Sequence, residues 1–136
     1  MRAKWSCFEM AKILVVDDEA QVRGMLVKML SVEHHEVIEA ENGTQGCKKY
    51  RKHRPDLLIT DLVMPEKNGI DMILELKKEF PAIRIVAISG GGGITGSFDY
   101  LPIAKLVGAL HILQKPFTLQ ALKSAVAEAL EVPEVH

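Results

Sequence analysis

The stretch ILVVDDEA, from Ile13 to Ala20, decides the fold because it joins a run of apolar residues directly to three consecutive acids. Branched aliphatic residues in an unbroken row are typical of a strand that is covered on both faces of a parallel sheet. Asp17, Asp18 and Glu19 then fall just past the end of this strand. Carboxylates held so close repel one another, so we expect a cation to offset their charge.

Short apolar runs alternate with longer amphipathic ones along the rest of the chain, which is typical of βα units around a parallel sheet. The predicted strands are Lys12–Val16, Glu36–Ala40, Leu57–Thr60, Ile83–Ser89 and His111–Gln114. Asn42, Asn68 and Thr118 are predicted to cap the second, third and fifth helices. The fourth helix is placed from about Phe98 to Val107. Apolar residues at helical spacing predict the buried faces of the first, third and fifth helices: Val22, Met25, Leu26, Met29 and Leu30; Ile70, Ile73, Leu74 and Phe80; Leu119, Leu122, Val126 and Ala129.

Five βα units in roughly 120 residues are too few for a closed eight-stranded barrel and predict a doubly wound, flavodoxin-like α/β fold. Its five-stranded parallel sheet would have the order 2-1-3-4-5, between two layers of helices. In this order a crevice opens beyond the carboxyl ends of the first and third strands, where such sheets bind ligands. Asp17 and Asp18 follow the first strand and Asp61 follows the third, so all three carboxylates are expected to meet there.

The composition of the 136-residue chain suits one ordinary globular domain, with 48% hydrophobic and 26% charged residues. A formal net charge of -1 provides no overall field for nucleic acid or anionic lipid, and we expect neither direct nucleic-acid binding nor membrane insertion. Cys7 and Cys47 match neither a metal-ligand spacing nor a disulfide framework, which favours a reducing, cytoplasmic location. We expect residues 11–131 to form the domain, residues 1–10 to be an extension or tag remnant, and residues 132–136 to be a tail.

The residue types at the strand ends indicate phosphoryl chemistry. Oxygen ligands without organised His or Cys favour a hard cation, and Mg²⁺ in particular binds one or two carboxylates while leaving room for phosphate oxygens. A carboxylate beside Mg²⁺ can act as a nucleophile toward a phosphoryl group. Ser89 ends the fourth strand and can hydrogen-bond a phosphoryl oxygen, and Lys115 follows the fifth and supplies a positive charge.

Four motifs at these strand ends resemble the receiver domain of two-component response regulators, in particular stand-alone receivers of the chemotaxis type. They are VVDDE after the first strand, DLVMPEKNG from Asp61 to Gly69, AISG at the end of the fourth strand and QKPF from Gln114 to Phe117. The resemblance extends from about Ala11 to Leu130. It implies that Asp61 accepts a phosphoryl group from a sensor histidine kinase or a phosphotransfer protein, and that a downstream protein reads the resulting change.

The same resemblance implies a role for each residue of the site. The implied Mg²⁺ ligands are the carboxylates of Asp18 and Asp61, that of Asp17 mainly through water, and the backbone carbonyl of Val63. Ser89 would be a hydroxyl switch, and Lys115 would pair with the phosphoryl group, directed by a cis Lys115–Pro116 peptide bond. We expect a phosphoacceptor that assists its own phosphotransfer and dephosphorylation rather than an enzyme, and a monomer or a phosphorylation-dependent dimer.

Two departures from the family pattern concern how a signal leaves the site. Ile112 stands three residues before Lys115, where many receivers have a Tyr or Phe that swings inward. The segment between Ser89 and Lys115 is longer than usual, with the excess in the glycines Gly90 to Gly93. We hypothesise that phosphorylation draws Ser89 inward and reorders residues 90–97, because glycines lose much backbone entropy when they become ordered.

Other interpretations of the same residues remain open. Asp18 and Glu19 can cap the first helix, and a degenerate receiver would bind proteins without being phosphorylated. A Mg²⁺-dependent phosphohydrolase with Asp61 as its nucleophile would need a second acid two residues later, where Val63 stands. The basic run KKYRKHR, from Lys48 to Arg54, is predicted to be a solvated helix face rather than a docking patch for an acidic partner.

Overall fold

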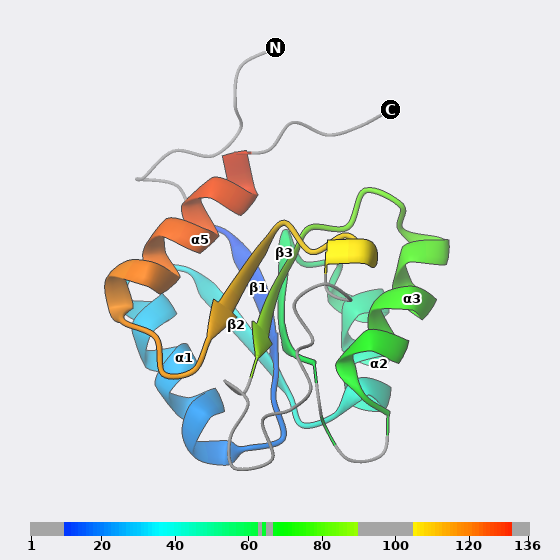
Figure 1. The fold of residues 1–136 in the computed structure, drawn as a ribbon, viewed down its shortest axis with the longest axis horizontal. Coiled ribbons are helices and arrows are strands. Elements are labelled where there is room, and N and C mark those ends of the chain that lie inside the picture. Colours follow the sequence, from blue (N-terminus) through cyan, green and yellow to red (C-terminus); the bar gives the residue numbers. More distant parts are fainter. Residues whose placement is uncertain (1–9, 63, 65–66, 90–104, 132–136) are drawn as a thin grey trace.

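The parallel sheet predicted from the sequence is present. The computed structural model describes residues 10–62, 64, 67–89 and 105–131, and its strands pair in the order β2-β1-β3-β4-β5 (Figure 1). The strands are β1 (Lys12–Val16), β2 (Glu36–Ala40), β3 (Leu57–Asp61), β4 (Ile85–Ser89) and β5 (His111–Gln114). The helices are α1 (Ala20–Val32), α2 (Gly43–His53), α3 (Gly69–Glu79) and α5 (Leu119–Glu131). The doubly wound, flavodoxin-like α/β fold is therefore confirmed.

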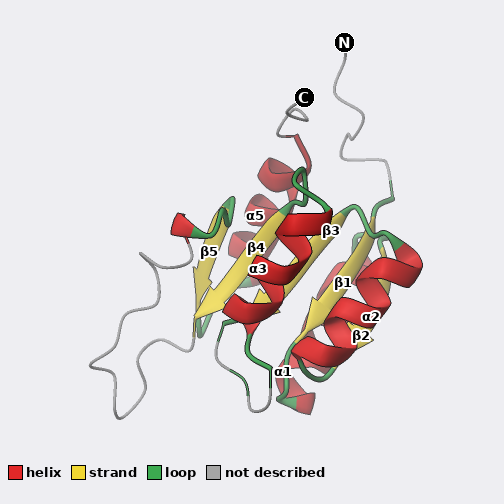
Figure 2. Cartoon of the chain, turned by 90° about the vertical axis from the view of Figure 1, so that its right-hand side faces the viewer, coloured by secondary structure: helices red, strands yellow, loops and turns green. Residues whose placement is uncertain are grey.

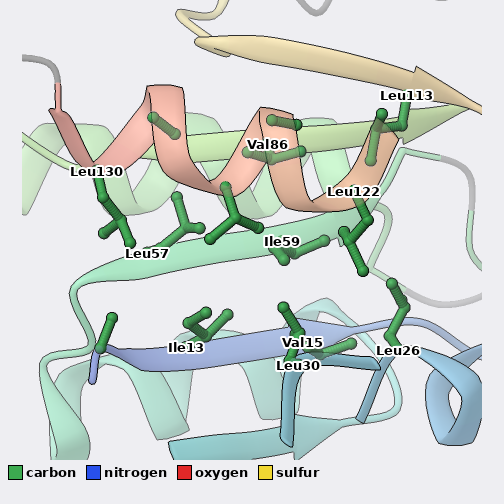
Figure 3. Packing of buried hydrophobic residues seen from close by; sticks show 14 of the residues in the cluster. Ile13, Val15, Leu26, Leu30, Leu57, Ile59, Val86, Leu113, Leu122 and Leu130 are labelled. Carbon is green, nitrogen blue, oxygen red and sulfur yellow. The ribbon is translucent and has the colours of Figure 1, made fainter. Parts of the chain in front are cut away.

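Helices cover both faces of the sheet, and the sheet separates the hydrophobic core into two clusters. Figure 2 shows α2 and α3 in front of the sheet and α5 behind it. Ile13 and Val15 belong to a cluster with α1 and α5, part of which is drawn in Figure 3. Leu14 and Val16 belong to a second cluster, with α2 and α3. Because successive strand residues point to opposite faces, a strand between two cores must be apolar at every position, and this explains the unbroken apolar run.

Two strand boundaries differ from the prediction by one or two residues. β3 continues through Asp61, which still pairs with β4, so the predicted end at Thr60 is one residue too early. β4 begins at Ile85 rather than at Ile83. The backbone N–H of Ile83 instead donates to the carbonyl of Phe80, 3.0 Å away, and closes the turn after α3.

The predicted helix caps are confirmed. The side chains of Asn42, Asn68 and Thr118 each accept a hydrogen bond from the backbone N–H three residues further along the chain. Most of the helix predicted from Phe98 to Val107 lies outside the described residues, although its positions 105 and 106 are helical. None of the helices that the structure describes is long and apolar enough to cross a membrane.

The predicted apolar helix faces pack against the two cores with three exceptions. Met25, Leu74 and Leu119 are 37%, 47% and 40% exposed. The predicted apolar stripes of α1, α3 and α5 are therefore wider than the buried faces of these helices. The basic run from Lys48 to Arg54 is largely exposed, as predicted, except that Tyr50 is buried.

Candidate functional site

Polar side chains are buried at the carboxyl ends of the strands. In the described part of the chain, the buried polar residues are Asp17, Thr60, Asp61 and Ser89. Asp17 directly follows β1, Asp61 ends β3, Ser89 ends β4, and Lys115 directly follows β5. Parallel strands place these ends at one edge of the sheet, so the structure brings the residues together where the sequence predicts a crevice.

Close packing explains why the motif from Asp61 to Gly69 has its spacing. The backbone N–H of Gly69 donates to the carbonyl of Leu62, 3.0 Å away. A Cβ atom at Gly69 would overlap the carbonyl oxygen of Asp61, so only glycine permits this approach. Met64 is 6% exposed and anchors the loop in the core beside α2 and α3. The motif therefore fixes the backbone at the end of β3, where Asp61 lies.

One lysine faces three carboxylates at this edge. The Nζ atom of Lys115 lies 2.9 Å from Oε1 of Glu19, 3.3 Å from Oδ2 of Asp61 and 3.5 Å from Oδ2 of Asp17. Burial lowers the pKa of Lys115, but the hydrogen bond to Glu19 and the charges of Asp61 and Asp17 outweigh it, and the pKa is raised above its ordinary value. Lys115 therefore stays charged and acts as an internal counter-ion.

Asp17 is the most enclosed carboxylate of the site. Its side chain is fully buried, and its Oδ1 accepts a hydrogen bond of 2.9 Å from the backbone N–H of Glu19. Its Oδ2 has no hydrogen-bond partner in the described residues. Burial raises the pKa of Asp17, although the Glu19 hydrogen bond and the charge of Lys115 act in the opposite direction. A buried carboxylate oxygen without a donor is a position that suits a cation.

The donor set of the site fits a hard divalent cation. Asp17, Glu19 and Asp61 each offer a carboxylate oxygen, and these oxygens all lie within 4.8 Å of one another. Oxygen donors alone are the ligands that Mg²⁺ prefers. Asp18, the implied direct ligand, is exposed and does not belong to this group. Val63, whose carbonyl is another implied ligand, lies outside the described residues, so both assignments stay predictions.

Sequence reasoning missed the contacts by which two residues, Glu19 and Arg23, organise the turn after β1. Glu19 precedes α1, but its side chain makes no capping hydrogen bond and contacts Lys115 instead. Arg23 donates from Nη1 to the carbonyl of Asp17, 2.7 Å away, and from Nε to Glu39, 3.2 Å away. Glu19 could have been recognised as part of the site, because it is the third consecutive acid of the motif. Arg23 had no comparable signal in the sequence, because its side-chain partner Glu39 becomes a neighbour only when α1 packs beside β2.

The two strands next to Lys115 are joined at the site. The backbone N–H of Lys115 donates to the carbonyl of Ser89, 2.9 Å away. The Lys115–Pro116 peptide bond is cis, as the resemblance implies.

Ile112 is half-buried and packs against the core beside α2 and α3. The glycines Gly90 to Gly93 lie outside the described residues, as does the reordering hypothesised for residues 90–97.

Comparison with known proteins agrees with the fold and the acidic site. Residues 13–127 match the response regulator receiver domain family. The chain is 36% identical over 120 residues to the chemotaxis protein CheY of Bacillus subtilis strain 168, covering 88% of this chain and 97% of that protein. Sporulation initiation phosphotransferase F of the same strain is 31% identical over 119 residues, covering 88% of this chain and 93% of that protein.

A solved structure gives the same result. The crystal structure of a response regulator receiver domain protein from Clostridium thermocellum superposes with a TM-score of 0.78 and 32% identity, covering 89% of this chain and 94% of that one. The chain therefore belongs to the response regulator receiver domain family of two-component systems. Proteins of this family are signalling modules, and the cluster of Asp17, Glu19 and Asp61 fits their phosphoacceptor site.

Proposed function

We propose that the protein is a phosphoacceptor of a two-component phosphorelay, in which Asp61 takes a phosphoryl group from a sensor histidine kinase or a phosphotransfer protein. The observation that carries this proposal is the meeting of Asp61, Asp17 and Lys115 at the ends of three strands. Family membership supports the same function. Phosphorylation would change a face of the domain that a downstream protein binds.

Asp61 would act as the nucleophile. One of its Oδ atoms would form a new bond to phosphorus and give an acyl phosphate. The bond from phosphorus to the donor atom breaks at the same time, and its electron pair leaves with the donor. Lys115, with Nζ 3.3 Å from Oδ2 of Asp61, can pair with a phosphoryl oxygen as negative charge develops there. Ser89 can donate its hydroxyl to another phosphoryl oxygen.

Asp17 and Asp61 would hold Mg²⁺, with Asp18 as a further ligand at the rim and the carbonyl of Val63 as the implied backbone ligand. The Oδ2 atom of Asp17, which accepts no hydrogen bond in the described residues and lies 3.5 Å from Nζ of Lys115, supports this assignment. Bound Mg²⁺ would supply positive charge that offsets the carboxylates and the phosphoryl oxygens. The turn after β1 contributes by fixing Asp17, through its hydrogen bond from Glu19 and the contact of its carbonyl with Arg23.

Incubation with acetyl phosphate and Mg²⁺, followed by intact-protein mass spectrometry, tests this function. The wild-type protein should gain one phosphoryl group that hydroxylamine removes, and Asp61→Asn should gain none. Asp71→Asn is a matched control, because Asp71 is an exposed aspartate in the first turn of α3, and it should behave like wild type. Uptake by Asp61→Asn at the wild-type rate, or no uptake by wild type from acetyl phosphate or phosphohistidine donors, would contradict the proposal.

A further inference from the structure

Glu19 makes the shortest of the three carboxylate contacts of Lys115. The distance is 2.9 Å, against 3.3 Å for Asp61 and 3.5 Å for Asp17. The main chain at Glu19 is fixed, because its N–H donates to Oδ1 of Asp17. Its side chain is 60% exposed and is not engaged in capping α1. Glu19 therefore combines a fixed backbone with a carboxylate that can move into solvent.

The three partners of Lys115 differ in what happens when the site fills. Asp17 is fully buried and Asp61 nearly so, and both are the proposed ligands of the cation. Neither carboxylate can leave the site without carrying a charge through the protein interior. Glu19 can leave, because water solvates its exposed end. Once a cation occupies the other two carboxylates, Glu19 is the one that still competes for the lysine.

Resting on the proposed function, we infer that Glu19 is a positioning residue that holds Lys115 in the unphosphorylated site and competes with the phosphoryl group for it. When Asp61 carries a phosphoryl group, Nζ of Lys115 moves from Oε1 of Glu19 to a phosphoryl oxygen, and Glu19 turns toward solvent. The contact with Glu19 therefore lowers the affinity of the site for a phosphoryl group. It sets how much of the protein is phosphorylated at a given concentration of donor.

The size of the effect follows from the exposure of Glu19. Ion pairs with an exposed partner are weak because water screens them and because a long side chain loses freedom when it pairs. Removal of the competing charge should therefore strengthen phosphoryl binding by about two- to fivefold, which is the range expected for one such pair. Glu19 adjusts the response of the site without deciding whether the chemistry occurs.

The experiment measures binding of beryllofluoride, a phosphoryl analogue, at saturating Mg²⁺, so that a change in cation affinity does not enter. Glu19→Gln keeps the size of the side chain and removes its charge. Glu33→Gln is the matched control, since Glu33 pairs with Lys123 at 3.6 Å from the C-cap of α1. We expect Glu19→Gln to bind about two- to fivefold more tightly and Glu33→Gln to bind like wild type. Unchanged or weaker binding by Glu19→Gln would overturn the inference.

A second pair of measurements separates positioning of Lys115 from a general effect of charge at the rim. In a Lys115→Met background, Glu19→Gln should leave beryllofluoride affinity unchanged, and an equal gain in both backgrounds would overturn the inference. The side-chain ammonium NMR signal of Lys115 in ion-free protein should shift in Glu19→Gln but not in Glu33→Gln; an unshifted signal would also overturn it. If wild-type protein binds no beryllofluoride, the proposed function fails, while the ammonium signal still decides whether Glu19 contacts Lys115.

Discussion

The segment after β3 and the turn after β1 lie on two sides of the same site, and different kinds of interaction stabilise them. The loop after β3 is held by backbone contacts. Gly69 packs directly on the carbonyl of Asp61, and the N–H of Gly43 in α2 donates to the carbonyl of Lys67, 2.9 Å away. A Cβ atom at Gly43 would also overlap Lys67, so both approaches depend on glycine. The backbone therefore has little room to move at Gly43, Lys67 and Gly69.

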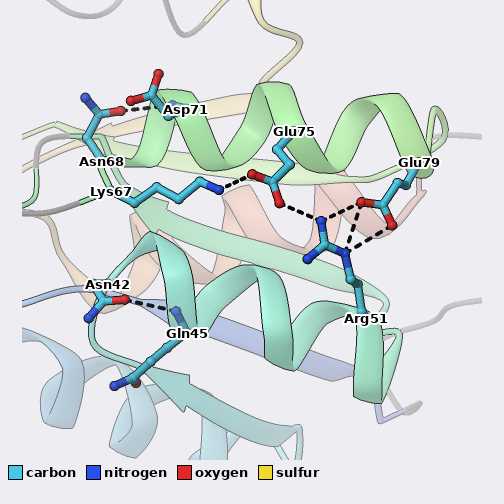
Figure 4. Close-up of polar contacts among 8 residues, drawn as sticks. All are labelled: Asn42, Gln45, Arg51, Lys67, Asn68, Asp71, Glu75 and Glu79. Carbon is cyan, nitrogen blue, oxygen red and sulfur yellow. Dashed lines mark hydrogen bonds and ion pairs between the residues drawn. The ribbon is translucent and has the colours of Figure 1, made fainter.

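Ion pairs on the surface connect the segment after β3 with α2 and α3 (Figure 4). Lys67 pairs with Glu75, and Nη2 of Arg51 lies 2.5 Å from carboxylate oxygens of both Glu75 and Glu79. The hydrogen bonds from Lys67 and Arg51 lower the pKa of Glu75 to about 2, so its carboxylate stays charged across the physiological range. These pairs connect Lys67, which lies in the segment after Asp61, with α2 and α3.

In the turn after β1, hydrogen bonds fix the main chain, and the carboxylates depend on charge balance. Asp17 is buried with one oxygen lacking a hydrogen-bond donor, and Lys115 offsets its charge from 3.5 Å while binding Glu19 more closely. We expect this arrangement to change when a cation or a phosphoryl group enters the site. The comparison teaches that Asp61, the proposed acceptor, is followed by residues held by close packing, whereas the carboxylates in the turn after β1 are held largely by ion pairs with Lys115.

The largest effect is expected from Gly69→Ala, which adds a methyl group where the backbone of Asp61 already fills the space. We expect the free energy of unfolding to fall by about 2–4 kcal/mol, measured by urea denaturation. Gly24→Ala is the matched control, because nothing lies within 4 Å of a Cβ atom at Gly24 in α1. It should gain about 0.5–1 kcal/mol from helix propensity. Equal changes in the free energy of unfolding for the two substitutions would contradict the conclusion that close packing holds the segment after β3.

Asp17→Asn should have the opposite sign in the absence of metal. In chelator it removes a buried charge while keeping an acceptor for the N–H of Glu19, so stability at neutral pH should rise by about 1 kcal/mol. With Mg²⁺ the order should reverse, because only wild type gains full binding energy. Thermal melts with and without Mg²⁺ measure both. A variant that is less stable in chelator would show that the charge of Asp17 stabilises the turn.

The pH dependence of this difference provides a further check. The pKa of Asp17 is raised in the folded state, so its charge destabilises the protein above that pKa, and the cost disappears as pH falls through it. The advantage of Asp17→Asn in chelator should therefore shrink on acidification toward the ordinary pKa of an aspartate. An advantage that grows on acidification would contradict the direction of the shift.

Asp18→Asn should have a smaller effect on stability, because Asp18 is exposed. In chelator we expect a gain within about 0.5 kcal/mol, from the loss of one like charge. Mg²⁺ affinity should fall if Asp18 is the direct ligand that the family resemblance implies. Unchanged Mg²⁺ affinity in a titration followed by NMR would instead assign the third carboxylate to Glu19, which lies in the cluster with Asp17 and Asp61.

The smallest effect is expected from Arg51→Gln, which removes the pairs with Glu75 and Glu79. These side chains are exposed and screened by water, so the thermal midpoint should fall slightly at low salt and be unchanged at high salt. A loss that persists at high salt would mean that Arg51 contributes by packing against α3. Its ion pairs would then contribute little to the stability of the segment after β3.

The sequence by itself determined the architecture and the principal residues of the site. Apolar runs identified all five strands, and three of them, β1, β2 and β5, begin and end where predicted. Parallel topology brings residues at the carboxyl ends of the strands to one edge, so the sequence alone predicts that Asp17, Asp61, Ser89 and Lys115 lie together. The physical reason is that periodicity and strand direction determine which edge of the sheet a residue reaches.

Only the tertiary structure decided which side chains at that edge of the sheet contact one another. It turned Glu19 toward a lysine 96 residues away in the sequence, left Asp18 in solvent, and closed Gly69 onto the backbone of Asp61. These outcomes depend on distances of a few ångströms between segments that meet only after folding. No local pattern encodes such distances, because the rotamer of a rim carboxylate is chosen by the charges and atoms that other strands place beside it.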